Sequence, residues 1–293
     1  MALSFTMTSA PGASASPASS KRRVLVTGAA GRIGLYFSRH AHSNYDLRLM
    51  VRGNEGNLPQ LEGLGEIVRA SLNDLPRLKE ISHGIDTVLH LAANPDPSAV
   101  WNDLLHDNII GTYHVMAAAK SQRVRRVVYA SSVHAVAGYP PDSQIKTNEP
   151  VNPGDLYGVS KCFGEAMGRY LAEHEGVSVI ALRIGAVQRP ENAQKDDGIG
   201  WADMFISYRD LVQIIEKSIE VQNLQWGIFN AVSDNRFKRL DITNARELLG
   251  YVPQDDFMEH HPGFKPLKLN QRLDTASMRD KGQKSGMRED VSS

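Results

Sequence analysis

The stretch VTGAAGRIG, residues 26–34, decides the fold of this 293-residue chain. It places Gly28, Gly31 and Gly34 at three-residue intervals, after the apolar run RRVLVT and before a helical pattern. Glycines so spaced allow a tight turn, close approach of the backbone to a pyrophosphate and close packing of the helix. The helix N-terminus, with free N–H groups and a positive dipole end, would face the phosphates. The stretch therefore predicts a dinucleotide-binding loop, with a simple turn as the alternative.

Strands and helices alternate along the chain, which favours the dinucleotide loop over a simple turn. Short β-branched runs predict strands at 22–28, 46–52, 66–70, 86–93, 125–132 and 177–185, and helical spacing predicts helices over 31–42, 74–81, 107–120 and 157–174. The alternation predicts an α/β fold, a doubly wound, Rossmann-like parallel sheet over residues 21–185. A helix at 209–220, a strand at 226–232 and a helix at 242–250 predict a small C-terminal substrate lobe over 186–260.

Composition and termini limit the class of protein. Hydrophobic residues make up 41% and charged residues 23%, and Lys+Arg and Asp+Glu are 33 each, which favours neither nucleic acid nor a membrane as partner. No apolar run is long enough to span a bilayer. The single Cys162 excludes an internal disulfide and indicates a reducing, cytoplasmic location. Residues 1–20 predict a disordered extension, with an organellar transit peptide as the alternative, and residues 261–293 predict a polar tail.

The segment DLYGVSK, residues 155–161, places Tyr157 and Lys161 one helical turn apart on the same face. An ammonium beside a phenol favours the phenolate, so we expect the pKa of Tyr157 to fall toward neutrality and the phenol to act as a general base. Ser132 ends a predicted strand 25 residues earlier, at the edge where parallel sheets bind ligands. An exposed Tyr–Lys pair without function is the alternative. Asn108 is expected to order the helix backbone and a water leading to Lys161.

The second strand, LRLMVRG, bears on the choice of cofactor. An acid usually ends this strand to hold the ribose of NAD, whereas a nearby arginine accommodates the extra phosphate of NADP. Here Val51 takes the place of the acid and Arg52 follows, which favours NADP or the use of both cofactors. The alternative is that Arg52 is solvated and Glu55 holds the ribose. The remaining residues predicted to bind the cofactor lie on the loops after the strands: Ala30, Arg32, Ile33, Leu91, Ala92, Ala93 and Ile184, with Tyr157 and Lys161.

The order and spacing of VTGAAGRIG, HLAA, NIIGT, the serine pair, YGVSK and ALRIG resemble an extended short-chain dehydrogenase/reductase of the NAD-dependent epimerase/dehydratase superfamily, over residues 22–255. SSVHAV, LRIG and ARELLGYVPQDD are most similar to uronate dehydrogenases and archaeal-type NAD-dependent glucose 6-phosphate dehydrogenases. The resemblance implies oxidation of the anomeric hydroxyl of an anionic aldose to a lactone. It implies Tyr157 as base, Lys161 as its activator, Ser132 as substrate anchor and Asn108 as fourth member, with no metal.

Departures from the uronate dehydrogenase pattern leave the substrate open among a hexuronate, a hexose 6-phosphate and a sulfosugar. Val133 replaces an amide, and Ala186 replaces a serine after LRIG. His134 is the best candidate for a sugar contact, with simple packing as the alternative. Arg189 and Lys195, in the loop at 187–201, could bind the anion through charge-assisted bonds or could be solvated. Asn94 and Ser98 are further polar candidates after the fourth strand.

Three other functions compete with the sugar dehydrogenase hypothesis. A nucleotide-sugar epimerase or dehydratase shares the fold and the Ser-Tyr-Lys set but usually has a larger C-terminal domain. An NADPH-linked carbonyl reductase would suit Arg52. A non-catalytic redox sensor is disfavoured because sensors on this fold typically lose the tyrosine or the lysine. We expect a homodimer or larger homo-oligomer.

Overall fold

The computed structural model describes residues 21–194 and 196–264. In this part of the chain, seven parallel strands form one sheet in the order β3-β2-β1-β4-β5-β6-β9. Their bounds are β1 (Arg23–Thr27), β2 (Asp46–Val51), β3 (Glu66–Arg69), β4 (Thr87–His90), β5 (Arg126–Ser132), β6 (Ser178–Ile184) and β9 (Trp226–Ala231). The predicted doubly wound sheet is confirmed. The predicted extension at 1–20, and the predicted tail from residue 265 onward, lie outside the described residues.

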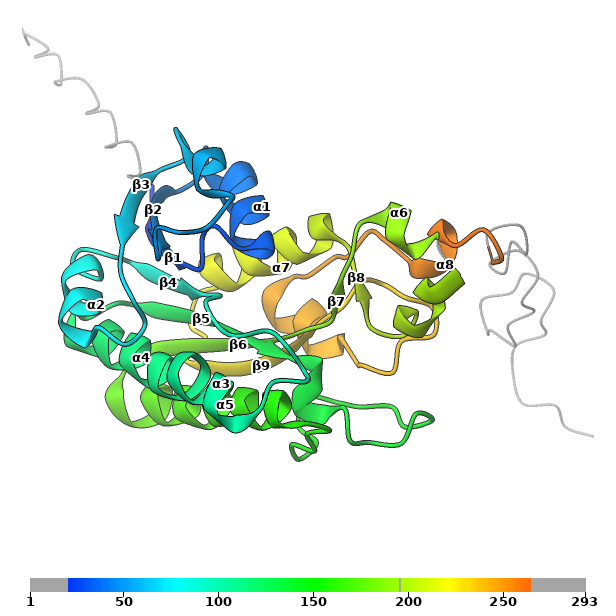
Figure 1. Cartoon of the computed structure of the whole chain (residues 1–293). Coiled ribbons are helices and arrows are strands. Elements are labelled where there is room, and N and C mark those ends of the chain that lie inside the picture. The colour runs from blue at the N-terminus through cyan, green and yellow to red at the C-terminus, as the bar shows by residue number, and fades with distance from the viewer. Residues whose placement is uncertain (1–20, 195, 265–293) are drawn as a thin grey trace, which may run out of the picture.

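Helices cover both faces of the sheet (Figure 1). Helices α1 (Arg32–Ala41) and α7 (Tyr208–Glu220), with the π-helical turn η5 (Ala245–Leu249), pack on one face around a core that includes Phe37 and Ile214. Helices α2 (Leu75–Ile81), α4 (Gly111–Ser121) and α5 (Leu156–Glu175) pack on the other, around Val115 and Leu171. Strands β5 and β6 are buried along their whole length, which explains their continuous apolar runs. No described helix combines the length and the apolar character needed to cross a membrane.

The segment predicted as a separate C-terminal lobe contributes instead to the main layers. Strand β9 pairs with β6 as the seventh strand, and α7 packs beside α1. The second half of β9 is buried, and buried backbone groups need hydrogen-bond partners. The backbone of β9 finds these partners in β6. Beyond the sheet lie the short strands β7 (Ala186–Val187) and β8 (Phe205–Ile206) and the short helices α6 (Pro190–Ala193), η4 (Asp196–Trp201) and α8 (Phe257–His260).

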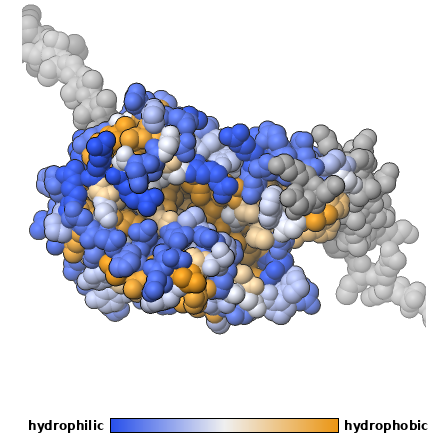
Figure 2. Space-filling model, viewed as in Figure 1, coloured by the Kyte–Doolittle hydropathy of each residue, from blue (hydrophilic) through white to orange (hydrophobic). Residues whose placement is uncertain are grey.

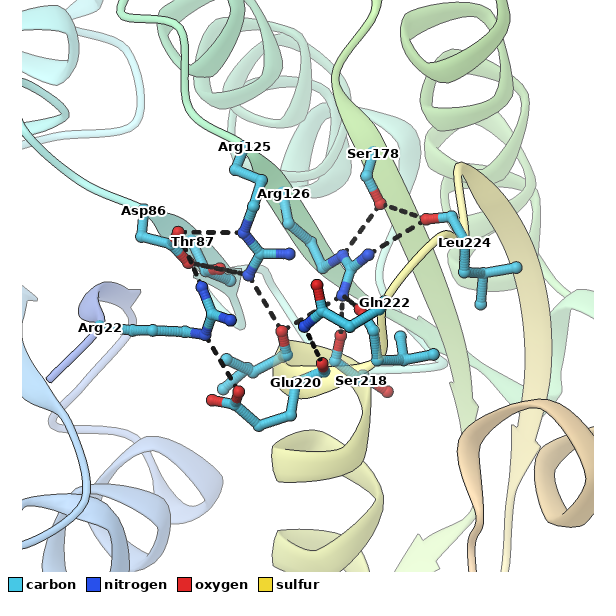
Figure 3. Close-up of polar contacts among 12 residues, drawn as sticks. Arg22, Asp86, Thr87, Arg125, Arg126, Ser178, Ser218, Glu220, Gln222 and Leu224 are labelled. Atoms are coloured by element: carbon cyan, nitrogen blue, oxygen red, sulfur yellow. Dashed lines mark hydrogen bonds and ion pairs between the residues drawn. The ribbon is translucent and has the colours of Figure 1, made fainter. Parts of the chain in front are cut away.

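A network of arginines fixes α7 at the amino edge of the sheet (Figure 3). Arg126 is buried at the start of β5, where its Nε donates to Ser178 Oγ (2.9 Å). Its Nη1 donates to the carbonyls of Ser218 (3.0 Å) and Ile219 (3.2 Å), the last turn of α7. These carbonyls have no partner within the helix, so the guanidinium satisfies them. The neighbouring Arg125 adds an ion pair to Asp86 and a bond to the same Ile219 carbonyl.

The strand order reverses between β1 and β4, so the connections from these two strands leave in opposite directions. Ligands of open α/β sheets bind at this switch point, outside the carboxyl ends of the strands. The residues that follow β1, β2, β4, β5 and β6 therefore converge on one edge of the sheet. The glycine loop, the serine pair and the helix that carries Tyr157 and Lys161 lie at that edge.

Candidate active site

The loop between β1 and α1 has no room for side chains at its glycine positions. Gly28 adopts φ +70°, and a Cβ there would come within 3.0 Å of the Ala92 backbone. A Cβ at Gly34 would lie 2.3 Å from the Gly28 carbonyl oxygen, closer than real Cβ contacts allow. Gly31 precedes the first turn of α1 with extended backbone and no side-chain cap on the helix N–H groups. The loop therefore fits the pyrophosphate of a dinucleotide, which backbone N–H groups would hold.

The turn after β2 presents an arginine to the site and turns a carboxylate inward. Arg52 has a side chain 68% exposed, while Val51 before it is buried. The Glu55 carboxylate accepts backbone N–H bonds from Arg52 and Gly53, both at 2.7 Å. Burial acts to raise the pKa of Glu55, but these bonds outweigh it, so the pKa lies below its usual value. Glu55 thus fixes the turn through both of its oxygens.

Helix α5 carries the tyrosine and the lysine, and its first turn is held tightly. Asp155 caps the helix by accepting from the Gly158 N–H at 2.7 Å. A Cβ at Gly158 would lie 2.3 Å from the His134 carbonyl oxygen, so glycine allows the helix to approach this segment. Tyr157 is 9% exposed and Lys161 4% exposed, one turn apart. Lys161 Nζ donates to the Ala130 carbonyl of β5 at 2.9 Å.

Burial dominates the protonation of both groups. It raises the pKa of Tyr157, against a hydrogen bond with Ser132 that acts to lower it. Burial lowers the pKa of Lys161 to about 8. We expected Lys161 to bring the pKa of Tyr157 toward neutrality. This expectation is wrong, because burial raises that pKa instead. The reason is geometric, because the ammonium bonds to a backbone carbonyl and lies 5.5 Å from the centre of the tyrosine ring.

Ser132 and His134 adjoin the tyrosine from the end of β5 and the short helix η3 (Val133–Val136). Ser132 Oγ accepts from the His134 N–H at 3.2 Å. His134 Nδ1 lies 2.6 Å from a carboxylate oxygen of Asp155, and its ring meets Tyr157 edge-on with centroids 5.4 Å apart. When Nδ1 carries the proton and donates to the carboxylate, Nε2 is left as an acceptor for a ligand hydroxyl.

Asn108 lies in the π-helical turn η2 (Leu105–Ile110), between α3 (Trp101–Leu104) and α4. Its side chain is buried and fully engaged. Oδ1 accepts from the Asn94 N–H at 2.7 Å, and Nδ2 donates to the Asn94 carbonyl and to Ser160 Oγ, both at 3.0 Å. Asn108 thus ties the loop after β4 to the residue preceding Lys161. It orders the backbone of this loop at Asn94, whereas its predicted contact with the helix backbone and its predicted link through water to Lys161 stay predictions.

One cavity of about 630 Å³ joins these features along the carboxyl edge of the sheet. Its wall includes both the glycine loop and Ser132, Tyr157 and Lys161. In the space-filling view, apolar surface lies in a hollow at the centre of the face shown, inside a mostly hydrophilic rim (Figure 2).

The family model described as the NAD dependent epimerase/dehydratase family matches residues 24–210, from β1 to the first turn of α7. The chain belongs to this family. Among its curated relatives, the NAD-dependent glucose-6-phosphate dehydrogenase of Haloferax volcanii is 36% identical over 258 residues, covering 83% of this chain and 97% of that protein. The L-arabinose 1-dehydrogenase (NAD(P)(+)) of the same organism is 31% identical over 253 residues, covering 80% and 97%. A solved uronate dehydrogenase of Agrobacterium tumefaciens, a mutant complexed with NAD, has a TM-score of 0.73 at 26% identity, covering 89% and 93%.

For this epimerase/dehydratase family member, the structure gathers most of the predicted site residues on the cavity wall. Every residue predicted to bind the cofactor lines it, as do four residues predicted for the substrate besides Tyr157. The lining set is Gly28, Ala30, Gly31, Arg32, Ile33, Gly34, Arg52, Leu91, Ala92, Ala93, Tyr157, Lys161 and Ile184, with Ser132, Val133, His134 and Ala186. Their roles in binding and catalysis stay predictions.

Four predicted residues lie off the wall, and residues that were not predicted also line it. Asn94 and Asn108 bond to each other behind the cavity, Ser98 bonds to Asp96, and Arg189 is exposed before α6. Lys195 lies outside the described residues. The wall also includes Gln188, Trp201 and Met204. All three belong to the irregular segment after β6, where no periodic pattern shows which side chains turn inward.

Proposed function

We propose that this protein is an NAD(P)⁺-dependent dehydrogenase that oxidises the anomeric hydroxyl of an aldose to a lactone. The observation that carries the proposal is the placement of Ser132, Tyr157 and Lys161 on the wall of the same cavity that the glycine loop lines. Relatives named as dehydrogenases of glucose 6-phosphate and L-arabinose, each covered over 97% of its length, support a sugar as substrate.

In the proposed oxidation, Tyr157, Ser132 and Lys161 have separate roles. NAD(P)⁺, when bound along the glycine loop, supplies the acceptor for the hydride that leaves the anomeric carbon. Tyr157 removes the proton of the anomeric hydroxyl, since it lies at the cavity wall beside Ser132. The Ser132 hydroxyl bonds to the same substrate oxygen and holds it against the phenol. The Lys161 ammonium, kept in place by the Ala130 carbonyl, attracts the charge that develops on the phenol as its proton moves, although burial outweighs this attraction in the pKa of Tyr157.

The first candidate substrate is an anionic aldose: a hexose 6-phosphate, a hexuronate or a sulfosugar. The glucose-6-phosphate relative and the uronate dehydrogenase structure support this class. His134, held by Asp155, is the residue proposed to contact the sugar. A specific observation supports an uncharged aldose as the second candidate. Among the described residues on the wall beyond Ser132, the segments after β5 and β6 contribute His134 and otherwise only side chains without charge: Val133, Gly185, Ala186, Val187, Gln188, Trp201 and Met204.

The test is an initial-rate assay of nicotinamide reduction with NAD⁺ and NADP⁺. Glucose 6-phosphate, glucuronate, galacturonate and sulfoquinovose are compared with glucose and L-arabinose, and Tyr157→Phe is the control enzyme. We expect one sugar to exceed the others clearly, and the variant to lose at least about 100-fold in kcat while still binding the cofactor. Absence of turnover with all six sugars, or an active variant, would refute the proposal.

We further propose that the protein acts in the cytoplasm as a homodimer. The single, free Cys162 supports a reducing compartment. Leu156, Val159 and Tyr170 form an exposed apolar stripe along α5, and Tyr113 is exposed on the adjacent α4. Such a stripe is typical of a surface that pairs with another molecule. A sedimentation mass of twice 32.3 kDa would support the dimer, and a monomeric mass would contradict it.

A further inference from the structure

A line of buried polar side chains crosses an otherwise apolar layer between the glycine loop and Lys161. Thr27 Oγ1, at the end of β1, lies 2.8 Å from His90 Nδ1 at the end of β4. His90 Nε2 lies 3.4 Å from Thr112 Oγ1 on α4, and the His90 ring lies beside the Tyr129 ring of β5, with centroids 5.9 Å apart. Each of these four side chains is at most 2% exposed. The proposed reaction uses none of them.

The direction of the hydrogen bonds in this line is determined at its first member. Thr27 Oγ1 accepts the N–H groups of residues 91 and 92, each at 3.2 Å, so its own proton goes to His90 Nδ1. His90 then carries its proton on Nε2 and donates toward Thr112. Burial, with the charge of Lys161 as the second cause, lowers the pKa of His90 to about 3. The imidazole is therefore neutral, and it adds no positive charge near the lysine.

At the other end of the line, the Lys161 ammonium lies over two aromatic rings. Nζ is 5.4 Å from the ring centre of Tyr129 and 5.5 Å from that of Tyr157. A cation within about 6 Å of a ring face is attracted by the ring quadrupole, and the attraction grows when water is excluded. Lys161 is buried, so the Tyr129 ring supplies attraction that solvent does not.

The position of the Tyr129 ring is set by its neighbours on β4 and α5. On β4, the His90 ring lies beside it, with ring centroids 5.9 Å apart. On α5, a Cβ at Gly164 would lie 2.1 Å from the Tyr129 hydroxyl oxygen, so only glycine leaves room for the ring. Gly164 is three residues from Lys161 on the same helix, and the ring therefore fits where it faces the ammonium.

We propose that Tyr129 is a positioning residue for Lys161, whose ring keeps the ammonium charged and directed toward Tyr157. The catalytic meaning of this rests on the proposed function, but the contact between ring and ammonium does not. The other titratable groups that act on or lie against Lys161 are His90 from β4 and Tyr157 from α5, while Glu165 and Cys162 from α5 act on Tyr129. Among the described residues, the two tyrosine rings are the groups over which the ammonium lies.

The experiment weakens the ring quadrupole without changing the shape of the core. Position 129 is filled with phenylalanine and then with phenylalanines bearing one, two and three fluorines. The pKa of the Lys161 ammonium is followed by NMR of labelled lysine and assigned with Lys161→Met. We expect the pKa to fall with each fluorine, by about half a unit to one unit in total. The same series at Phe37, buried on the opposite face of the sheet, is the matched control and should leave the Lys161 pKa unchanged.

A flat response at position 129, or an equal response at position 37, would overturn the proposal. The titration needs no substrate, so it separates this inference from the proposed function. If a sugar is oxidised, the alkaline limb of kcat should shift to lower pH by the same amount, with KM unchanged. If the pKa shifts but no sugar is oxidised, the proposed function fails and the role of Tyr129 stands.

Discussion

Arg52 and Glu55, in the turn after β2, are the two side chains that bear on the choice between NADP and NAD. Glu55, the alternative ribose ligand, has both oxygens on backbone N–H groups of its own turn. Arg52 is exposed at the cavity wall, where its Nε lies 3.9 Å from Glu55 Oε1 and its guanidinium can meet an added phosphate. The 2′-phosphate of NADP would thus meet a guanidinium, whereas the ribose of NAD would not depend on it.

Replacing Arg52 therefore tests cofactor choice. In Arg52→Ala, kcat/KM for NADP⁺ should fall about 10- to 100-fold, the range for one lost charge-assisted hydrogen bond, while the value for NAD⁺ stays within about twofold. Steady-state rates with both cofactors measure this. Arg39→Ala, an exposed arginine of α1 away from the cavity wall, is the matched control. Equal losses with both cofactors would show that Arg52 is not a phosphate ligand.

Residues with a fixed spacing could be predicted from the sequence, but residues that depend on tertiary contacts could not. Ser132, Tyr157 and Lys161 meet at the cavity because strand end and helix turn place them there. The pairing of His134 with Asp155 joins residues 21 apart, and no periodicity signals it. From the sequence alone, Tyr129 cannot be distinguished from any other residue of a buried strand. Its contact with Lys161 depends on Gly164, which only the packing of α5 on β5 shows.

The elements of the sheet were predictable because strands buried on both faces read as continuous apolar runs. The predicted strand at 86–93 is longer than β4 (Thr87–His90), since the residues after His90 leave the sheet to line the cavity. The assignment of β9 to a separate lobe was wrong. Strands β6 and β9 pair across about 40 intervening residues, and no local sequence pattern indicates a pairing at that distance. The helix predicted at 107–120 begins in a π-helical turn, which no propensity predicts.

The glycine loop gives the most direct prediction at this scale. In Gly34→Ala the new Cβ would overlap the Gly28 carbonyl and the Ala29 backbone, so α1 would shift from the first strand. We expect cofactor affinity to fall at least about tenfold and the melting temperature to drop. Gly56→Ala is the control, since a Cβ there meets nothing within 4 Å. Calorimetry of binding and of unfolding measures both quantities, and a Gly34→Ala protein that binds normally would contradict the assignment of the loop.

The whole molecule should lose stability in acid through His90. Its pKa is about 3 in the folded protein, against an ordinary value of 6.5. The unfolded chain therefore binds the proton first as the pH falls. The contribution of neutral His90 to the free energy of unfolding is complete above pH 6.5 and is lost as the pH falls toward 3. In this range His90 adds a slope of about 1.4 kcal/mol per pH unit to the free energy of unfolding. Urea unfolding between pH 4.5 and 6.5 should show a shallower slope for His90→Asn than for the unsubstituted protein. The exposed His40→Asn should not change it, and equal slopes in all three would show that His90 is not buried as a neutral ring.

The central claim is that the cavity oxidises an aldose at its anomeric carbon. The most direct measurement uses the best sugar of the initial-rate assay, carrying deuterium at C1, and follows the label by mass spectrometry. The account predicts that deuterium moves to the reduced nicotinamide, that a lactone forms, and that Tyr157→Phe abolishes both. Label retained in the sugar while another carbon is oxidised or epimerised would contradict it.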